Sequence, residues 1–328
     1  RTGLGTRAAS TLGTFLSIVA QFLAGVAMLQ GVWPVSGTGG TAGVSLAILG
    51  FIFLGGLKSY GALGKAKIAF LYLVLASCVA VSVVGGTAPL TLWEGLSPSP
   101  WFDLFGRGMA KDLNAGFSLV VGVLTTQIYV QAIFAASSER TAQAGALLSS
   151  ALMPPLGLLA IWVGMAMRVN QPGLAPSQVL PVFIFENFPP LVAGCLWSGI
   201  AITIVGTAAG LCLGIATNLA RDLPSFLPPG KPDDRGVLMG TRLALLVLVL
   251  SAAGLARLAP DTLILSWSYL SMGLRGAGTA FPFALAVVAP GRLEPRWAFF
   301  SSLAGLFAAI PWPATGLAGD PLFVGLLL

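Results

Sequence analysis

Two threonines one helical turn apart offer oxygen atoms that could bind a metal cation inside an apolar segment. Thr203 and Thr207 lie at the centre of the run 191–218, which is rich in Ala, Gly and aliphatic residues. Residues four apart share one helical face, so the Thr207 hydroxyl and the Thr203 carbonyl could ligate a cation together. The structural alternative is that small residues allow close helix packing and the Thr hydroxyl bonds to the preceding turn. Composition alone leaves both interpretations open.

A second helical face carries two side-chain amides. Gln127 and Gln131 lie four residues apart in the run 115–136, and amides that face lipid would be costly. We therefore expect this face to border protein or an aqueous cavity, although plain hydrogen bonding between helices would explain it equally well. Gly116 and Gly122 of the same run could break the helix and free backbone groups for a ligand.

An arginine lies near the middle of the apolar run 262–289. A charged side chain at that depth is a functional candidate, and Arg275 could pair with an anionic group on a substrate. The alternative is that the Gly-rich backbone around Arg275 lets the guanidinium reach a carbonyl or water. Ser17 and Gln21, one turn apart in the run 9–31, are further candidates for facing a cavity.

The missing residue types exclude several kinds of chemistry. The chain has no histidine, so His-ligated metal sites and Ser-His-Asp triads are impossible. No nucleotide-binding glycine motif follows a strand and no paired carboxylates lie in the apolar runs, so we expect no enzymatic activity. Because the apolar runs contain essentially no Asp or Glu, a proton relay is disfavoured. A non-protonating ion such as sodium, held by hydroxyls and backbone carbonyls, suits this chain better.

The composition defines the elements that must position these residues. Charged residues make up only 9% of the 328 residues, whereas hydrophobic residues make up 56%. An average soluble domain carries roughly 25% charged residues, and a disordered chain needs low hydrophobicity and high charge. Both classes are therefore excluded, and the sequence predicts an all-α integral membrane protein in contact with the lipid bilayer.

Charges and turn-forming residues divide the chain into a single transmembrane domain, 1–328. We expect nine full spans and the partial stub of a tenth, at about 9–31, 43–57, 67–87, 115–136, 143–167, 191–218, 238–257, 262–289, 297–314 and 321–328. The chain starts with Arg1 rather than Met and ends in an apolar stub, which favours an internal piece of a longer polypeptide.

Basic residues indicate the orientation in the membrane. Most of the 17 Lys and Arg residues, including Lys58, Lys65 and Lys67, fall in alternate loops on one side. By the positive-inside rule this side is cytoplasmic, and the first span starts there. The formal net charge of +6 therefore reflects inner-face bias and not binding of nucleic acid. We expect the protein in the bacterial inner (plasma) membrane.

Four segments resemble the sodium:solute symporter family. They are a Gln-x-x-x-Gln segment with its short turn and Ala-rich helix at 125–168, a Leu-Pro start and Arg-Asp finish around a small-residue helix at 180–223, a Gly-Gly pair at 51–67, and two late helices at 274–306. The order and spacing of these segments resemble the family over nearly the whole chain.

The resemblance implies the inverted-repeat leucine-transporter fold with its site at mid-membrane. The spans would be core helices three to ten and one more, and the first two core helices would be lacking. Family sodium ligands would fall on Thr203, Gly206 and Thr207, where Gly206 replaces the usual Ser and removes one oxygen. Implied substrate-binding positions would include Gln21, Ser118, Gly122, Gln127 and Ser268, beside the Gln131 and Arg275 noted above.

The sequence therefore favours a secondary active transporter. We expect sodium-coupled symport of a small organic solute by alternating access, with sodium co-transported and a carboxylate on the solute to match Arg275. One alternative keeps the fold but makes the protein a sodium-independent or proton-coupled permease. The other is a non-transporting, symporter-like sensor module.

Overall fold

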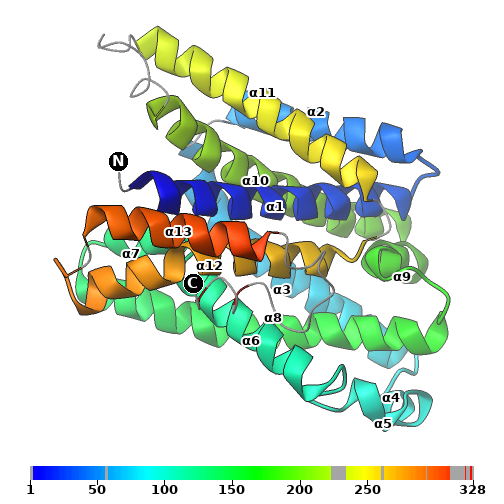
Figure 1. The fold of residues 1–328 in the computed structure, drawn as a ribbon. Coiled ribbons are helices and arrows are strands. Elements are labelled where there is room, and N and C mark those ends of the chain that lie inside the picture. The colour runs from blue at the N-terminus through cyan, green and yellow to red at the C-terminus, as the bar shows by residue number, and fades with distance from the viewer. Residues whose placement is uncertain are drawn as a thin grey trace. The chain divides into compact units, whose positions relative to one another are not determined.

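The structure is a computed structural model, which describes residues 3–55, 58–222, 234–259, 262–292, 294–310, 322 and 326. These residues form helices and turns, with no strand among them, as the sequence predicts. The helices are α1 Gly3–Gln30, α2 Gly37–Gly55, α3 Lys58–Val84, α4 Pro89–Gly95, α5 Pro98–Trp101, α6 Met109–Leu124, α7 Gln127–Phe134, α8 Glu139–Asn170, the 3-10 helix η1 Pro176–Gln178, α9 Val179–Asn187, α10 Pro190–Asp222, α11 Asp234–Leu258, α12 Ile264–Val288 and α13 Pro295–Ala309 (Figure 1).

Six of the described helices are long and apolar enough to cross a membrane, namely α1, α3, α8, α10, α11 and α12. They indicate an integral membrane protein. α2 has a shorter apolar segment, Gly37–Phe53. The expected span 297–314 corresponds to α13, whose helix ends at Ala309. The expected stub 321–328 lies outside the described residues, except for 322 and 326.

The run 115–136, expected to be one helix, is two helices. α6 ends at Leu124 and α7 begins at Gln127. At the junction the Thr125 hydroxyl donates to the carbonyls of Val121, at 2.8 Å, and Gly122, at 3.2 Å. These bonds draw the chain back onto the last turn of α6, because a Thr hydroxyl competes with the backbone for helix carbonyls.

The described residues gather in two compact units. Unit 1 contains residues 1–17, 97–148 and 265–328, and unit 2 contains residues 18–96 and 149–264. The helices α1 and α8 contribute residues to both.

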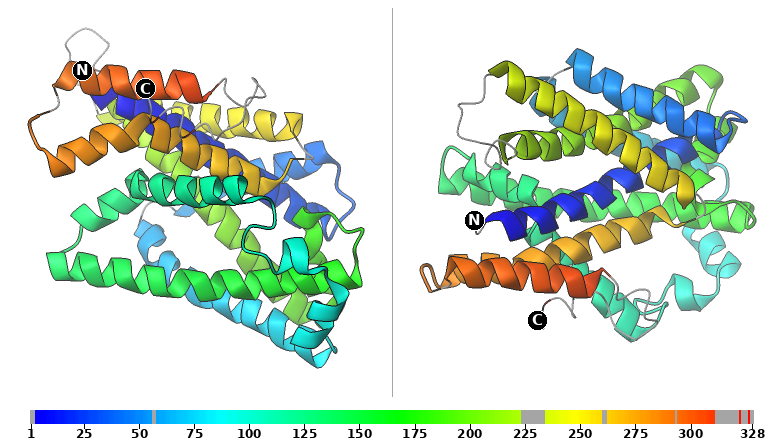
Figure 2. Two further views of the ribbon diagram at one scale, coloured as in Figure 1. Left: turned by 60° about the horizontal axis from the view of Figure 1, so that its bottom comes forward. Right: turned by 45° about the horizontal axis from the view of Figure 1, so that its top comes forward.

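Glycines bring the helices of unit 1 close together. A Cβ atom at Gly278 of α12 would lie 2.4 Å from Cβ of Ala9 on α1 and 3.3 Å from the carbonyl oxygen of Ser302 on α13. A Cβ at Gly122 of α6 would lie 2.4 Å from Cβ of Met272 on α12. Such small-residue contacts let backbones approach, as is typical of helices inside membranes. The helices α12 and α13 accordingly run side by side (Figure 2).

In unit 2, α10 is the central helix and packs against α2, α3, α9 and α11. A buried cluster that includes Val74 and Cys78 of α3, Phe183 of α9 and Leu196 of α10 forms its core. Gly199 is required on α10, since a Cβ there would lie 1.9 Å from Cε1 of Phe70 on α3. The Phe70 ring therefore lies directly against the α10 backbone.

An ion pair stabilises the start of α6, outside the apolar spans. Arg107 donates from Nε to Oδ1 of Asp112 at 2.7 Å and from its backbone N–H to Oδ2 at 3.1 Å. The hydrogen bond from the Arg107 side chain lowers the pKa of the Asp112 carboxyl. The carboxylate lies in the first turn of α6, where a negative charge interacts favourably with the helix dipole. Because Arg107 is exposed to solvent, the effect of the pair on stability is small.

The close contact at Gly278 gives a test of the packing in unit 1. We expect Gly278→Ala to lower the unfolding temperature of the detergent-solubilised protein, at a cost of roughly 1–3 kcal/mol, because α1 or α12 must move to admit the methyl group. The control is Gly116→Ala on α6, where an added Cβ has no neighbour within 4 Å. A glycine replaced by Ala in an open helix position gains helix propensity. Equal effects of the two substitutions would contradict this packing.

Candidate functional site

The buried guanidinium of Arg275 is the centre of a polar cluster in unit 1. Arg275 lies halfway along α12 and is 4% exposed. Its Nη1 donates to the hydroxyl of Thr126 at 3.1 Å, and its Nη2 donates to the hydroxyls of Ser271 at 3.0 Å and Ser17 at 3.5 Å. Nε donates to the Ser271 carbonyl at 3.2 Å. The cluster thus joins α1, α12 and the junction between α6 and α7.

The three hydroxyls all turn lone pairs toward the arginine. Ser271 donates its hydrogen to the carbonyl of Gly13 on α1, and Thr126 donates to the carbonyl of Gly122 at 2.6 Å. The Ser17 and Ser271 oxygens lie 2.6 Å apart. Because the Ser271 hydrogen is already used, Ser17 is the donor in that pair. Each hydroxyl oxygen is therefore left as an acceptor for the guanidinium.

Gly13 makes room for the arginine stem. A Cβ at Gly13 would lie 2.3 Å from Cγ of Arg275 and 2.8 Å from the Ser271 carbonyl oxygen. Sequence reasoning singled out Arg275 and Ser17 but missed Gly13, Thr126 and Ser271. A usable signal existed, since Gly13 and Ser17 are four residues apart and so are Ser271 and Arg275.

The positive charge of Arg275 has no acidic partner within the described residues, where both ion pairs involve other arginines. Neutral oxygens satisfy its hydrogen bonds but leave the charge uncompensated. An ionised group at this depth is costly and is usually paired. The C-terminal end of α6, which carries a partial negative charge, lies beside it through Thr126 and offsets part of the charge.

The other predicted positions on α6 and α12 differ in burial and in hydrogen bonding. Gly116 and Gly122 do not break the helix, because α6 continues through both to Leu124. Ser118 is 1% exposed, one turn before Gly122, and its hydroxyl has no hydrogen-bond partner within the described residues. Ser268 is half-buried on α12, two turns before Arg275.

The remaining predicted positions are Gln21, Gln127 and Gln131. Gln21 is half-buried on α1, one turn after Ser17, and belongs to unit 2. The backbones of Gln127 and Gln131 lie in α7, but their side chains are outside the described part of the chain.

The predicted cation ligands lie in unit 2, beside a lysine that sequence reasoning did not connect with them. Thr207 of α10 donates its hydroxyl hydrogen to the Thr203 carbonyl at 2.7 Å. The same hydroxyl oxygen accepts a hydrogen bond from Nζ of Lys67 on α3. Thr203 and Thr207 are half-buried and Gly206 is buried. The oxygens expected to hold sodium are therefore engaged with each other and with an ammonium group.

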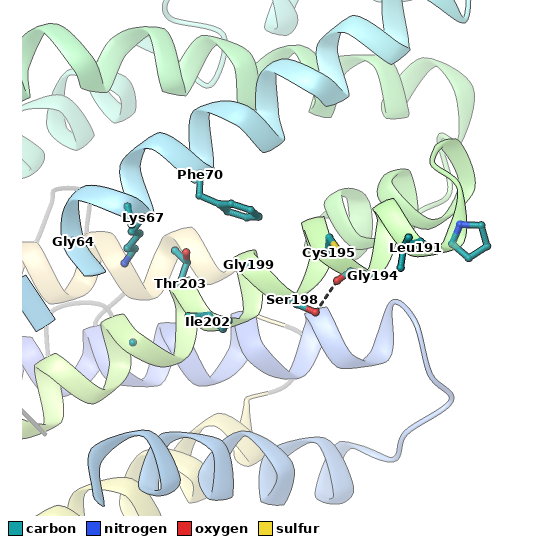
Figure 3. Close-up of a pocket in the computed structure, with 13 residues that line it drawn as sticks. Gly64, Lys67, Phe70, Leu191, Gly194, Cys195, Ser198, Gly199, Ile202 and Thr203 are labelled. Carbon is teal, nitrogen blue, oxygen red and sulfur yellow. Dashed lines mark hydrogen bonds between the residues drawn. The ribbon is translucent and has the colours of Figure 1, made fainter. Parts of the chain in front are cut away.

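A cavity of about 750 Å³ lies between α3 and α10 at this point. Lys67 and Phe70 line it from α3, and Gly199, Thr203 and Gly206 line it from α10. Figure 3 shows Lys67 reaching from α3 toward α10 near Thr203. Most of the lining is apolar, and its polar side chains are Lys67, Ser198 and Thr203.

No group of three or more His, Cys, Asp or Glu side chains gathers in the part of the chain that the structure describes. The described residues therefore hold no candidate site of that kind for a transition metal. Comparison with protein-family models finds no match to this chain, and comparison with curated protein sequences finds none either.

The Thr126 contact gives a test of the arginine cluster. We expect Thr126→Val to destabilise the protein by roughly 1–3 kcal/mol, because Nη1 of the buried Arg275 loses its acceptor. Thr126→Ser keeps the hydroxyl and should retain most of the stability. Thermal unfolding in detergent measures both. If Ser proves as damaging as Val at this position, the methyl group matters and the hydrogen bond does not.

Proposed function

We propose that this chain forms the helix bundle of a secondary active transporter that carries a small organic solute with a carboxylate group. The observation that carries the proposal is Arg275, a buried cation at the middle of a membrane-length helix, held by hydroxyls and without an acidic partner among the described residues. An intramembrane ionisable residue of this kind is typical of a substrate or ion pathway.

The hydrogen bonds around Arg275 leave a place for a carboxylate. A guanidinium has five N–H donors, and the described partners use four of them. The contact with Ser17, at 3.5 Å, is the longest. A carboxylate that takes the unused Nη1 hydrogen and replaces Ser17 at Nη2 would form a two-pronged ion pair. The solute would supply the negative charge that the described residues do not place beside Arg275.

The break between α6 and α7 supports the same proposal. Transporter sites lie near the bilayer midplane and are built from discontinuous helices. Here the broken segment contributes Thr126 directly to the arginine cluster. We further propose the inverted-repeat fold of the sodium:solute symporter family, without its first two core helices, in the bacterial inner membrane. This part of the proposal rests on the sequence resemblance and the inner-face charge bias.

Two modes of transport are candidates, one coupled to sodium and one independent of it. The sequence resemblance favours sodium, bound at Thr203, Gly206 and Thr207 and carried together with the solute. The contact of Lys67 with Thr207 favours a sodium-independent permease instead, because an ammonium group already occupies the hydroxyl oxygen. Both candidates share the solute site and alternating access, in which a ligand shifts the balance between conformations by binding one of them more tightly.

Uptake of labelled solutes into proteoliposomes tests the role of Arg275. We expect simple carboxylates to compete for uptake and neutral sugars to have no effect. Arg275→Gln should reduce uptake at least tenfold, because a lost pair with a desolvated charge is worth more than about 1.4 kcal/mol. The control is Arg296→Gln on α13, which removes an exposed arginine paired with Glu294. Competition by sugars but not by carboxylates in the unmodified protein would overturn the proposal without relying on any variant.

Replacement of sodium by choline distinguishes the two coupling candidates. A sodium symporter should lose uptake in choline, and Thr207→Ala should raise the sodium concentration needed for half-maximal uptake. A sodium-independent permease should transport equally in both salts. The measurement is the initial uptake rate at equal ionic strength.

A further inference from the structure

Lys67 makes a contact that its place in the sequence does not suggest. It lies in the cytoplasmic half expected for α3, where a lysine commonly extends along the helix toward the lipid headgroups. Instead its side chain is half-buried and its ammonium donates to the hydroxyl of Thr207 on α10. The neighbouring Phe70 ring rests on Gly199 of α10, which fixes the distance between the two helices.

The local hydrogen bonds make Thr207 an acceptor for a cation. Its own hydrogen is donated to the Thr203 carbonyl at 2.7 Å, so a lone pair of its oxygen points away from that bond. Gly206, one residue earlier, has no side chain that could contribute a further oxygen. The turn from Thr203 to Thr207 is thus a weak metal site but a sufficient partner for one N–H of an ammonium group.

We infer that the ammonium of Lys67 is a tethered cation, which holds the Thr203–Thr207 turn of α10 to α3 in the place where a dissociable sodium ion would otherwise bind. That Lys67 replaces a transported sodium ion rests on the proposed function, whereas its contact with Thr207 involves only α3 and α10. A lysine at this place favours the sodium-independent permease, in which Lys67 has a positioning role.

A tethered cation differs from a bound ion in two physical respects. It is always present at high effective concentration, because it is part of the same chain. It also remains attached when the helices separate, so its charge never leaves with the solute. Sodium in solution would have to displace a covalently attached competitor from an oxygen that it needs.

The cavity beside Lys67 makes the role testable by chemical rescue. The space of about 750 Å³ adjoins the lysine, and Lys67→Ala would remove three methylenes and the ammonium group. A small primary ammonium ion such as n-propylammonium matches the removed part in size and charge. Choline has a similar charge but no N–H to donate to Thr207.

The experiment measures thermal unfolding of the full-length protein in detergent, in sodium chloride or choline chloride at equal ionic strength. We expect the unmodified protein to unfold at the same temperature in both salts. Lys67→Met should lower that temperature by roughly 3–8 °C, since a charge-assisted hydrogen bond is lost. The exposed Lys111 of α6 provides the control, because Lys111→Met removes the same charge outside this contact.

Two further variants test whether Lys67 and Thr207 stabilise the protein through one shared contact. The double variant Lys67→Met with Thr207→Val should unfold no lower than the more damaged single variant, because both substitutions remove one shared interaction. Added n-propylammonium should raise the unfolding temperature of Lys67→Ala, and choline should not.

Three results would overturn the inference. The first is sodium-specific stabilisation of the unmodified protein that Thr207→Val abolishes, which needs no lysine variant. The others are an unchanged unfolding temperature for Lys67→Met and additive effects in the double variant. All three are independent of uptake. Absence of carboxylate uptake would therefore remove the proposed function and leave the tethered contact standing, whereas loss of the contact would leave the solute site intact.

Discussion

The structure depends on how apolar helices accommodate two cationic side chains with neutral oxygens alone. Arg275 in unit 1 and Lys67 in unit 2 both donate to hydroxyls of neighbouring helices. Neither forms an ion pair with an acidic side chain among the described residues. A charge in such surroundings is tolerated only when every available dipole is oriented toward it. The positions of nearby Ser and Thr residues therefore determine where these cations can lie.

The hydroxyls achieve this orientation through bonds that, taken alone, would look purely structural. Thr207 donates to the Thr203 carbonyl and Thr126 donates to the Gly122 carbonyl, in each case four residues earlier in the sequence. Such bonds compete for helix carbonyls and can bend or end a helix. Here they also fix the hydroxyl hydrogen, so that the oxygen can only accept. The same hydrogen bond of each threonine therefore shapes the helix and leaves the hydroxyl oxygen free to accept from a cation.

Glycines provide the second condition, which is close approach of the backbones. An arginine or lysine stem reaches a neighbouring helix only where no Cβ atom stands in the way. Gly13 leaves room for Arg275, and Gly199 lets Phe70, three residues after Lys67, rest on α10. The high glycine content of the apolar segments is therefore tied to the polar contacts as well as to helix packing.

The sequence predicted those features that follow from composition and local periodicity. The helical membrane class, the approximate spans and the prominence of Arg275 came from apolar run length and from the cost of a buried charge. The partners of Arg275 did not, because Thr126 and Ser271 acquire their roles only through tertiary contacts between distant segments. The run 115–136 was expected to be one span that Gly116 or Gly122 could break, but α6 continues through both glycines and ends where Thr125 and Thr126 bond back to its last turn. Lys67 was counted with the inner-face charges, since sequence cannot tell whether a lysine stem turns to the headgroups or to a neighbouring helix.

The two cations differ in ways that suit different tasks. Arginine presents a planar fork with fixed donor directions, and one N–H of Arg275 is unused by the described residues. Such a group discriminates by geometry and favours a two-pronged anion. Lysine is a compact charge on a flexible stem, and Lys67 uses one bond to hold a helix turn. The lysine ammonium has little directional selectivity for acceptors, but its flexible stem lets it stay bonded when the neighbouring helix moves. Within the proposed transporter, this assigns recognition of the solute to Arg275 and attachment of the α10 turn to Lys67.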